Sequence, residues 1–335
     1  VPISEDGCEG DSFTVTVTIS PEPVVANQTA IVCSDEAIGV TLNPSTSVAV
    51  ASYNIIGINS NGLTATSGVT NTLVGNNYSS DVLLNDSYTN PTNAPVDVVY
   101  TIVPLSAQGV EGGAFTLTVT VNPELVVADQ EPIEVCSGEE VGVNFNASTS
   151  IAAATYNITA LNLNGLTVLS GNPSVSSGLL ASALSDDSFR NTTNDPVDVI
   201  YTVVPYDAIG CNGEAFTVTV TVKPAPVVAS QTVLNISSRN PVSVSFNAST
   251  SISAATYNIT NLFLNGLTVA SGNPGIGTGL LATSLSDDSF INRTSAPVDV
   301  IYTVVPVSAS GCEGDSFTVT VTISPEPVVA NQTAI

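Results

Sequence analysis

Strict alternation of apolar and polar residues marks one kind of segment, which occurs four times in the chain. The four sequences are FTVTVTIS at residues 13–20, FTLTVTVN at 115–122, FTVTVTVK at 216–223 and FTVTVTIS at 317–324. In each of them apolar side chains occupy one face and threonines the other, which is the pattern of a strand that is buried on one side. A proline-bearing link and a second apolar run follow each time. We therefore interpret each segment as the last strand of one domain, followed by a stiff joint and the first strand of the next domain.

The longest exact repetition in the chain spans this junction. Residues 7–31, which we call the seam, read GCEGDSFTVTVTISPEPVVANQTAI and recur letter for letter at residues 311–335. The offset between the two copies is 304 residues. Weaker copies divide this offset into three parts of domain size, which is too long for one turn of a solenoid. The sequence therefore predicts three domains and two partial ones, cut from a longer array.

The prolines of the joints set the predicted domain boundaries. The joints lie at residues 21–23, 123–125, 224–226 and 325–327. Proline restricts the backbone, and strands of about ten residues make a domain about 35–40 Å long, so we expect a rod-like array that spans on the order of 100–120 Å. The predicted parts are the C-terminal strand of a preceding repeat at 1–21, repeat 1 at 22–123, repeat 2 at 124–224, repeat 3 at 225–325 and the first strand of the next repeat at 326–335.

Within one repeat all the signals are those of β-strands, and no segment has a helical period. Seven or so short strands in about 100 residues predict an all-β fold of tandem immunoglobulin-like β-sandwiches. The dipeptide Asn164-Gly165 is a hairpin signal, so we expect the strand before it to pair with the strand after it. In repeat 2 the expected strands lie at about 126–135, 141–145, 154–163, 166–169 and 197–205, followed by the closing strand from Phe216.

Several motifs recur together with these strands. They are YTVVP at residues 201–205, GCNGEAFTVTVTVKPAPVV at 210–228, and the pair Cys136-Ser137 followed by an acidic residue. This combination resembles the PKD-like repeats of giant secreted proteins of Bacteroidota, and it covers essentially the whole chain. The resemblance implies an extracellular array of PKD-like sandwiches, of the kind found in cell-surface adhesins and filaments, with no enzymatic residues. Two positions depart from the pattern, because Val110 replaces the turn cysteine of repeat 1 and Ser237 replaces the first-strand cysteine of repeat 3.

The chain has five cysteines: Cys8, Cys33, Cys136, Cys211 and Cys312, of which the last is the copy of the first. Repeat 2 alone has both cysteine positions of the family, so the resemblance favours a disulfide between Cys136 and Cys211 in an oxidising compartment. Cys8 and Cys33 lack partners in their own repeats and flank the same joint. They either form a bridge across that joint or between neighbouring chains, or are free buried thiols that pack as small apolar residues.

The charge of the chain limits its partners. It has 29 acidic residues, four basic residues and no histidine, with a formal net charge of −25. Nucleic acid is excluded because its phosphates require basic counter-charges, and an anionic membrane surface is disfavoured for the same reason. No run of 18 apolar residues is present, so we expect no direct membrane insertion of this segment. The scarcity of lysine and the absence of methionine limit trypsin-like cleavage and sulfoxide damage, which suits an extracellular, cell-surface location.

The sequence offers little catalytic chemistry. Without histidine there is no Ser-His or Cys-His pair, and two adjacent aspartates do not form a general acid–base pair without a cleft to hold them. We therefore expect no enzymatic activity. Calcium is the only cofactor that the residues suggest, because hard cations prefer several carboxylate and carbonyl oxygens. The candidate ligands are the adjacent pairs Asp186, Asp187 and Asp287, Asp288.

These observations favour a structural function. Stiff joints and threonine-rich outer faces predict a shaft segment of a giant extracellular protein that forms a cell-surface filament or an adhesive appendage. Its partners would be further repeats of the same chain and neighbouring copies in a homo-oligomeric filament. The alternative is an adhesin module that binds a glycan or a protein through its loops, although these loops contain few aromatic residues. A third interpretation is a scaffold that carries a catalytic domain elsewhere.

Overall fold

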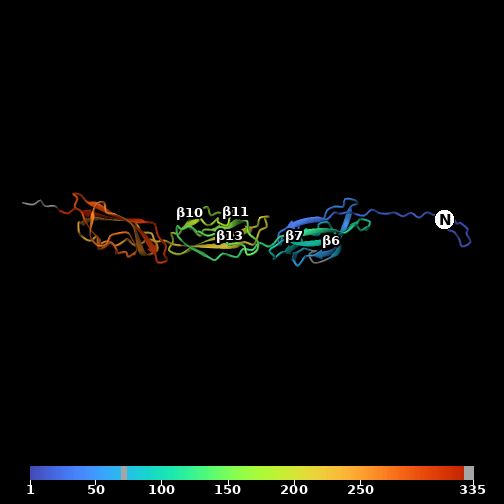
Figure 1. Ribbon diagram of the computed structural model, residues 1–335, viewed down its shortest axis with the longest axis horizontal. Helices are drawn as coiled ribbons and strands as arrows, with labels where there is room; N and C mark the ends of the chain where they lie inside the picture. Colours follow the sequence, from blue (N-terminus) through green and yellow to red (C-terminus); the bar gives the residue numbers. More distant parts are fainter. Residues whose placement is uncertain (69–73, 328–335) are drawn as a thin grey trace, which may run out of the picture. The chain divides into compact units, whose positions relative to one another are not determined.

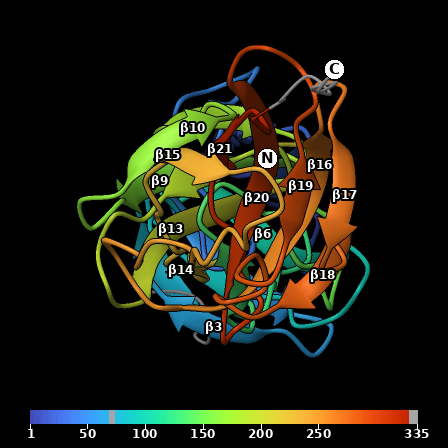
Figure 2. The ribbon, with the colours of Figure 1, turned by 90° about the vertical axis from the view of Figure 1, so that its left-hand side faces the viewer.

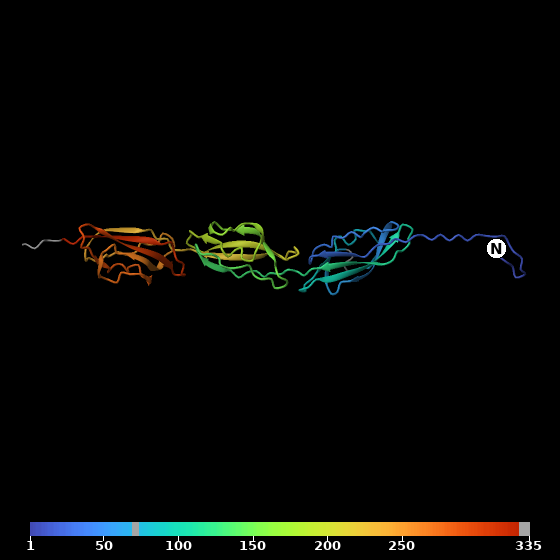
Figure 3. The same cartoon turned by 45° about the horizontal axis from the view of Figure 1, so that its top comes forward.

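The regular elements in the described part of the chain are β-strands, as the ribbons in Figures 1 and 3 show. The structure is a computed structural model that describes residues 1–68 and 74–327. In these two ranges it has 21 strands and no α-helix. Accordingly, the described part of the chain has no helix that could span a membrane. The chain divides into two compact units, Val1–Val127 with Ala147–Ala154 and Pro205–Glu214, and Ala128–Asn146 with Thr155–Val204 and Ala215–Ile335.

Repeat 1 contains one five-stranded sheet and one two-stranded sheet. The order in the large sheet is β1-β7-β6-β2-β4, and β3 pairs with β5. The first strand runs parallel to the closing strand β7, whereas β6 and β7 are antiparallel. The strands are β1 (Gln28–Val32), β2 (Val50–Asn59), β3 (Thr64–Ser67), β4 (Gly75–Tyr78), β5 (Ser87–Thr89), β6 (Val96–Ser106) and β7 (Phe115–Val121).

Repeats 2 and 3 repeat this topology, with sheet orders β11-β9-β13-β14-β8 and β15-β21-β20-β16-β18 and with the pairs β10-β12 and β17-β19. The all-β, tandem sandwich fold predicted from the sequence is thereby confirmed. In repeat 2 the strands are β8 (Ile133–Cys136), β9 (Thr155–Asn162), β10 (Thr167–Ser170), β11 (Ser176–Leu179), β12 (Ser188–Arg190), β13 (Val197–Tyr206) and β14 (Phe216–Lys223). In repeat 3 they are β15 (Gln231–Ser237), β16 (Ala254–Phe263), β17 (Thr268–Ser271), β18 (Gly277–Leu280), β19 (Ser289–Ile291), β20 (Val298–Ser308) and β21 (Phe317–Ser324).

The alternating closing strands β7, β14 and β21 lie inside each large sheet, between its first strand and its central strand. In repeat 3, β20 and β21 lie side by side (Figure 2), in a register that pairs Val300 with Val321 and Tyr302 with Val319. These four side chains are fully buried, while the threonines of β21 point to the other face. Because successive side chains of a strand alternate between its faces, the Thr/Val pattern places all the valines in the core. The predicted half-buried strand is confirmed for β7, β14 and β21.

The first copy of this segment, residues 13–20, forms no strand in this structure, so the C-terminal strand predicted for residues 1–21 stays a prediction. Its apolar side chains are exposed, with Phe13 at 65% and Ile19 at 87%. A strand requires neighbours that satisfy its backbone N–H and C=O groups. No strand in the described part of the chain pairs with these residues, whereas their copy β21 lies between β15 and β20.

Three details of repeat 2 also differ from the expectations. The turn at Asn164-Gly165 is present, with φ angles of 47° and 88°, but the strand after it, β10, pairs with β12 and not with β9. The predicted hairpin is therefore wrong, because the chain crosses from one sheet to the other at this turn. Residues 141–145 form no strand, and the first strand is shorter than predicted, since only Ile133–Cys136 pair with β14.

Candidate functional site at the joints between repeats

The turn before each closing strand is fastened to the joint in front of its own repeat. In repeat 2 the buried carboxylate of Asp207 accepts hydrogen bonds from the backbone N–H groups of Ile209 and Cys211, at 2.9 and 2.8 Å. Gly213 at the end of the turn lies so close to the joint that a Cβ there would clash with the carbonyl oxygen of Leu125. The turn therefore holds Cys211 directly beside the joint.

The same turn is built with other residues in the other repeats. In repeat 3 the Ser308 hydroxyl accepts the N–H of Cys312 at 3.0 Å, and Gly314 lies against the carbonyl of Pro226. In repeat 1 the Ser106 hydroxyl accepts the N–H of Val110 at 3.1 Å. The turn is therefore independent of the cysteine, and the sequence analysis missed the residue four positions before the cysteine site that organises it.

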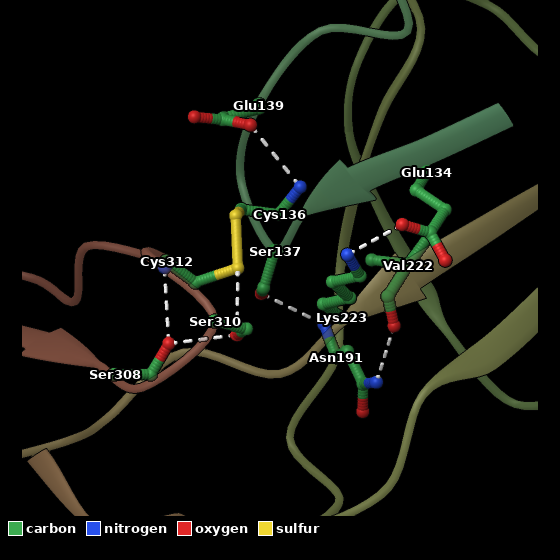
Figure 4. The surroundings of a disulfide bond; sticks show 10 residues. All are labelled: Glu134, Cys136, Ser137, Glu139, Asn191, Val222, Lys223, Ser308, Ser310 and Cys312. Carbon is green, nitrogen blue, oxygen red and sulfur yellow. Dashed lines mark hydrogen bonds and ion pairs between the residues drawn. A yellow bond between two sulfur atoms is a disulfide. The ribbon is translucent and has the colours of Figure 1, made fainter. Parts of the chain in front are cut away.

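A second device ties the end of the first strand to the exit of the closing strand. Asn191 is buried, and its backbone N–H donates to the Ser137 hydroxyl at 2.9 Å. Its side-chain amide donates to the carbonyls of Asp195 and Val222, both at 2.8 Å. Figure 4 shows this tie next to Cys136. Because Ser137 directly follows Cys136, the tie fixes the cysteine at the end of the repeat that leads into the joint.

Two disulfides join these places, Cys33–Cys211 and Cys136–Cys312, with Cα–Cα distances of 5.5 and 5.3 Å. Each connects the first-strand end of one repeat with the turn of the next repeat. Cys211 and Cys312 are buried. Around the second bond (Figure 4), the N–H of Cys136 donates to the Glu139 carboxylate at 3.1 Å. The bridges therefore cross the joints and do not close a single repeat.

The predicted disulfide between Cys136 and Cys211 is wrong, and the sheet register gives the reason. Cys136 pairs in parallel with Lys223 at the last residue of β14, whereas Cys211 lies in the turn before that strand begins. A strand of eight residues extends roughly 25 Å, while a disulfide requires Cα atoms within about 7 Å. The two cysteines of one repeat therefore lie at opposite ends of its closing strand.

The two interpretations of Cys8 and Cys33 are also corrected. Cys33 is bonded to Cys211, so it neither bridges to Cys8 nor remains a free thiol. Cys8 is free, but it is exposed and not buried. All five cysteines lie in the described residues, so these pairings account for every one of them.

At the joint that follows repeat 3, an ion pair is present and the cysteine of the cross-joint disulfide is absent. At the position of Cys136, repeat 3 has Ser237, and two residues further on Arg239 donates to the carboxylate of Glu326 at 2.5 Å. The Ser238 hydroxyl donates to the same carboxylate at 3.1 Å. The hydrogen bond from Arg239 lowers the pKa of Glu326. This ion pair ties the start of repeat 3 to the joint behind it.

The aspartate pairs proposed as calcium ligands point to opposite sides. Asp187 and Asp288 are buried, and they accept hydrogen bonds from the hydroxyls of Tyr201 and Tyr302 at 2.7 Å. Their neighbours Asp186 and Asp287 are exposed. Burial raises the pKa of Asp187, and the charge of Asp186 raises it further, while the bond from Tyr201 opposes the shift.

The described residues contain no group of three or more carboxylate, cysteine or histidine side chains placed to hold a metal ion. Calcium binding therefore stays a prediction, and the structure gives Asp187 and Asp288 another task in the core. The sequence analysis missed these tyrosine–aspartate pairs. Gly171 and Gly272 were a signal for them, because both have positive φ and a Cβ at either would clash with the aspartate.

These features define a class of protein, namely immunoglobulin-like β-sandwich repeats that are linked in tandem by disulfides across their joints. A comparison with protein families identifies the particular family. Four segments, residues 1–23, 30–125, 133–226 and 268–327, match the PKD-like domain. Because they cover more than half of the chain, the chain belongs to the PKD-like domain family. PKD-like domains are typically non-catalytic, and disulfides in such a fold indicate an extracellular protein.

Several solved structures are similar to this chain, including the following two. The chain is 10% identical to the chicken CNTN1 FN1-FN3 domains, over 90% of this chain and 99% of that one, with a TM-score of 0.29. It is also 10% identical to the I-band fragment I67-I69 of titin, over 90% of this chain and 97% of that one, with a TM-score of 0.27. These scores carry no argument about function. No curated protein sequence matches the chain.

Proposed function

We propose that this chain is a non-enzymatic structural segment of an extracellular protein and that it forms part of the shaft of a cell-surface filament or adhesive appendage. The observation that carries the proposal is the covalent bond between successive repeats, in Cys33–Cys211 and again in Cys136–Cys312. A disulfide within a repeat would stabilise that repeat alone. A disulfide across a joint adds a second covalent connection between two neighbouring repeats, which suits a shaft under tension.

The partners of the segment are neighbouring copies of the same chain, in addition to the repeats that precede and follow it. Each large sheet ends in a four-residue edge strand, β4, β11 or β18. Exposed apolar residues flank these edges at equivalent places: Val175 and Leu180 at β11, and Ile276 and Leu281 at β18. Edge strands and exposed apolar side chains both favour association with another chain. Their recurrence in successive repeats fits a partner with the same period.

Negative-stain electron microscopy of the native protein tests this proposal. We expect multi-chain bundles with an axial period set by the repeats. A double substitution at the edges, Val175→Lys with Ile276→Lys, should disperse the bundles. The matched control is Val168→Lys with Val269→Lys, which adds the same charge to exposed valines of the two-stranded sheets and should leave the bundles intact. Single chains at every concentration would contradict the proposal.

A ligand-binding adhesin module is the second candidate, and one observation favours it. A hollow of about 340 Å³ lies beside the Cys136–Cys312 bond, within the size range of small-ligand sites. Its lining includes Ser137 and Asn191 together with an exposed ion pair of Arg190 and Asp315 at 3.5 Å. Screening of the folded chain against glycans, with Arg190→Ala as the control variant, tests this function. Binding that disappears in the variant would favour the adhesin module over the shaft.

A further inference from the structure

The two disulfides interleave along the sequence. Their order is Cys33, Cys136, Cys211, Cys312, with the first bonded to the third and the second to the fourth. Three stretches of backbone therefore connect the same two bonds, namely residues 33–136, 136–211 and 211–312. This connectivity is a property of the covalent structure and holds whether or not the protein is folded.

Three parallel connections change what a protease achieves. Hydrolysis of one peptide bond adds one water and leaves a new carboxylate and a new amine, but in any one of the three stretches it leaves both new ends attached through the disulfides. Cuts in two different stretches still leave the third. Only when all three stretches are cut do the two bonds separate from each other. The block between Cys33 and Cys312 therefore tolerates cleavage.

Outside this block a single backbone carries the connection. In the chain these single stretches are residues 1–32 and 313–335, and they contain nearly all of the two copies of the seam. The joint in each copy of the seam lacks both cysteines of a cross-joint bridge, because Val110 occupies the turn position of the repeat after the first copy and Ser237 occupies the strand-end position of the repeat before the second. Since the two copies are identical, both losses belong to one type of joint.

We propose that the residues from Cys33 to Cys312 form a cleavage-tolerant covalent block, and that the seam is the segment where one cut by an extracellular endopeptidase separates successive blocks. The basic residues fit this division. Arg190, Lys223, Arg239 and Arg293 all lie inside the block, and none lies in residues 33–136 or in the seam. A trypsin-like protease therefore leaves residues 33–136 uncut and cannot separate the two disulfides, although cuts after both Arg239 and Arg293 release residues 240–293, which contain no cysteine. The proposal rests on the disulfide connectivity and not on filament assembly.

The first experiment establishes the pairing. Free thiols of the native protein are alkylated, and the denatured, unreduced chain is digested with a glutamate-specific protease. Because the protease does not cut the Glu22–Pro23 bond, we expect the peptide of residues 10–36 bonded to 141–214, and the peptide of residues 135–139 bonded to 215–313. Any other pairing, or alkylated Cys33 or Cys312, would overturn the proposal.

The second experiment measures the consequence with two matched variants. Glu9→Lys and Glu111→Lys place one lysine at the same position of the turn, in the seam and in the block respectively. After digestion with a lysine-specific protease in denaturant without reductant, Glu9→Lys should lose residues 1–9. Glu111→Lys should lose no residue and gain the mass of water. Reduction should then release residues 1–111 from Glu111→Lys.

Two further variants show which bond holds the fragment. With Cys211→Ser added to Glu111→Lys, residues 1–111 lose their only disulfide and should be released without reduction. With Cys312→Ser added instead, they stay bonded through Cys33 and should be retained. Release of residues 1–111 from the unreduced single variant Glu111→Lys, or retention of residues 1–9 in Glu9→Lys, would overturn the proposal.

Discussion

The joints behind repeat 2 and behind repeat 3 share one set of hydrogen bonds and differ in how they are fastened further. Both end in the same tie, from Ser137 to Asn191 at 2.9 Å and from Ser238 to Asn292 at 3.0 Å. The first also has the Cys136–Cys312 bond, whereas the second has the exposed ion pair of Arg239 and Glu326. The comparison shows that the serine–asparagine tie shapes the end of each repeat and that the disulfide adds attachment to the next repeat.

The largest expected effect comes from removal of a bridge. Each disulfide closes a long loop, with a sequence separation of 178 or 176, and chain entropy assigns such a loop about 5 kcal/mol. The variant Cys136→Ser with Cys312→Ser should lower the free energy of unfolding of the joined repeats by an amount of that order in denaturant titration. Cys8→Ser is the control and should change nothing, because Cys8 is already free. If both variants were equally stable, the disulfide would not stabilise the joint behind repeat 2, and the difference between the two joints would have no effect on stability.

The next effect should be equal at the two joints. Asn191→Ala and Asn292→Ala each leave two carbonyl oxygens without their donor, one of them buried (that of Val222 or Ile323), so each should cost about 1–3 kcal/mol. Thermal unfolding of both variants checks this. If only the substitution beside the disulfide destabilised the protein, the tie would depend on the bridge and the comparison above would fail.

A pH effect distinguishes the cores of the repeats from their joints. The pKa of the Asp187 carboxyl is about 3.9 in the unfolded chain, and burial raises this pKa in the folded protein. The protonated carboxyl therefore contributes stability that is fully present below about pH 4 and is lost as the pH rises through the folded pKa. Asp187→Asn keeps an acceptor for Tyr201, so its advantage over the wild type should grow from pH 4 to pH 7.

Chemical denaturation at several pH values measures this difference. Asp186→Asn is the control, because it removes the neighbouring charge but not the bond from Tyr201. It should reduce the loss of stability with pH and not abolish it. A constant difference between the wild type and Asp187→Asn across this pH range would contradict the prediction.

The smallest effect is expected at the ion pair. Arg239→Ala removes a contact that lies largely in water, where such pairs contribute about 0.2–1 kcal/mol and are screened by salt. The loss in the free energy of unfolding should fall further at high ionic strength. A loss as large as that of the bridge variant, independent of salt, would mean that the two joints are fastened equally well.

The sequence was sufficient to predict the strands in which apolar and polar residues alternate. Alternation in residues 216–223 and 317–324 predicted the closing strands and their buried faces, and the family motifs predicted the sandwich. It was insufficient for the disulfides, because the parallel pairing of β8 with β14 places Cys136 at the far end of the strand from Cys211. The sequence was also insufficient for the two adjacent aspartates before β12. Asp186 is exposed and Asp187 is buried, and adjacency in sequence does not show this difference.

The close approach of Gly213 to the carbonyl of Leu125 has a consequence for the recombination of genes that encode such repeats. The turn of repeat 2 is shaped against a residue that precedes the first strand of that repeat. A recombinant fragment that begins after Leu125 would lose the surface on which its own turn rests. Recombination that duplicates repeats is therefore tolerated best when the breakpoint lies upstream of the proline joint, so that every new copy inherits the joint in front of it.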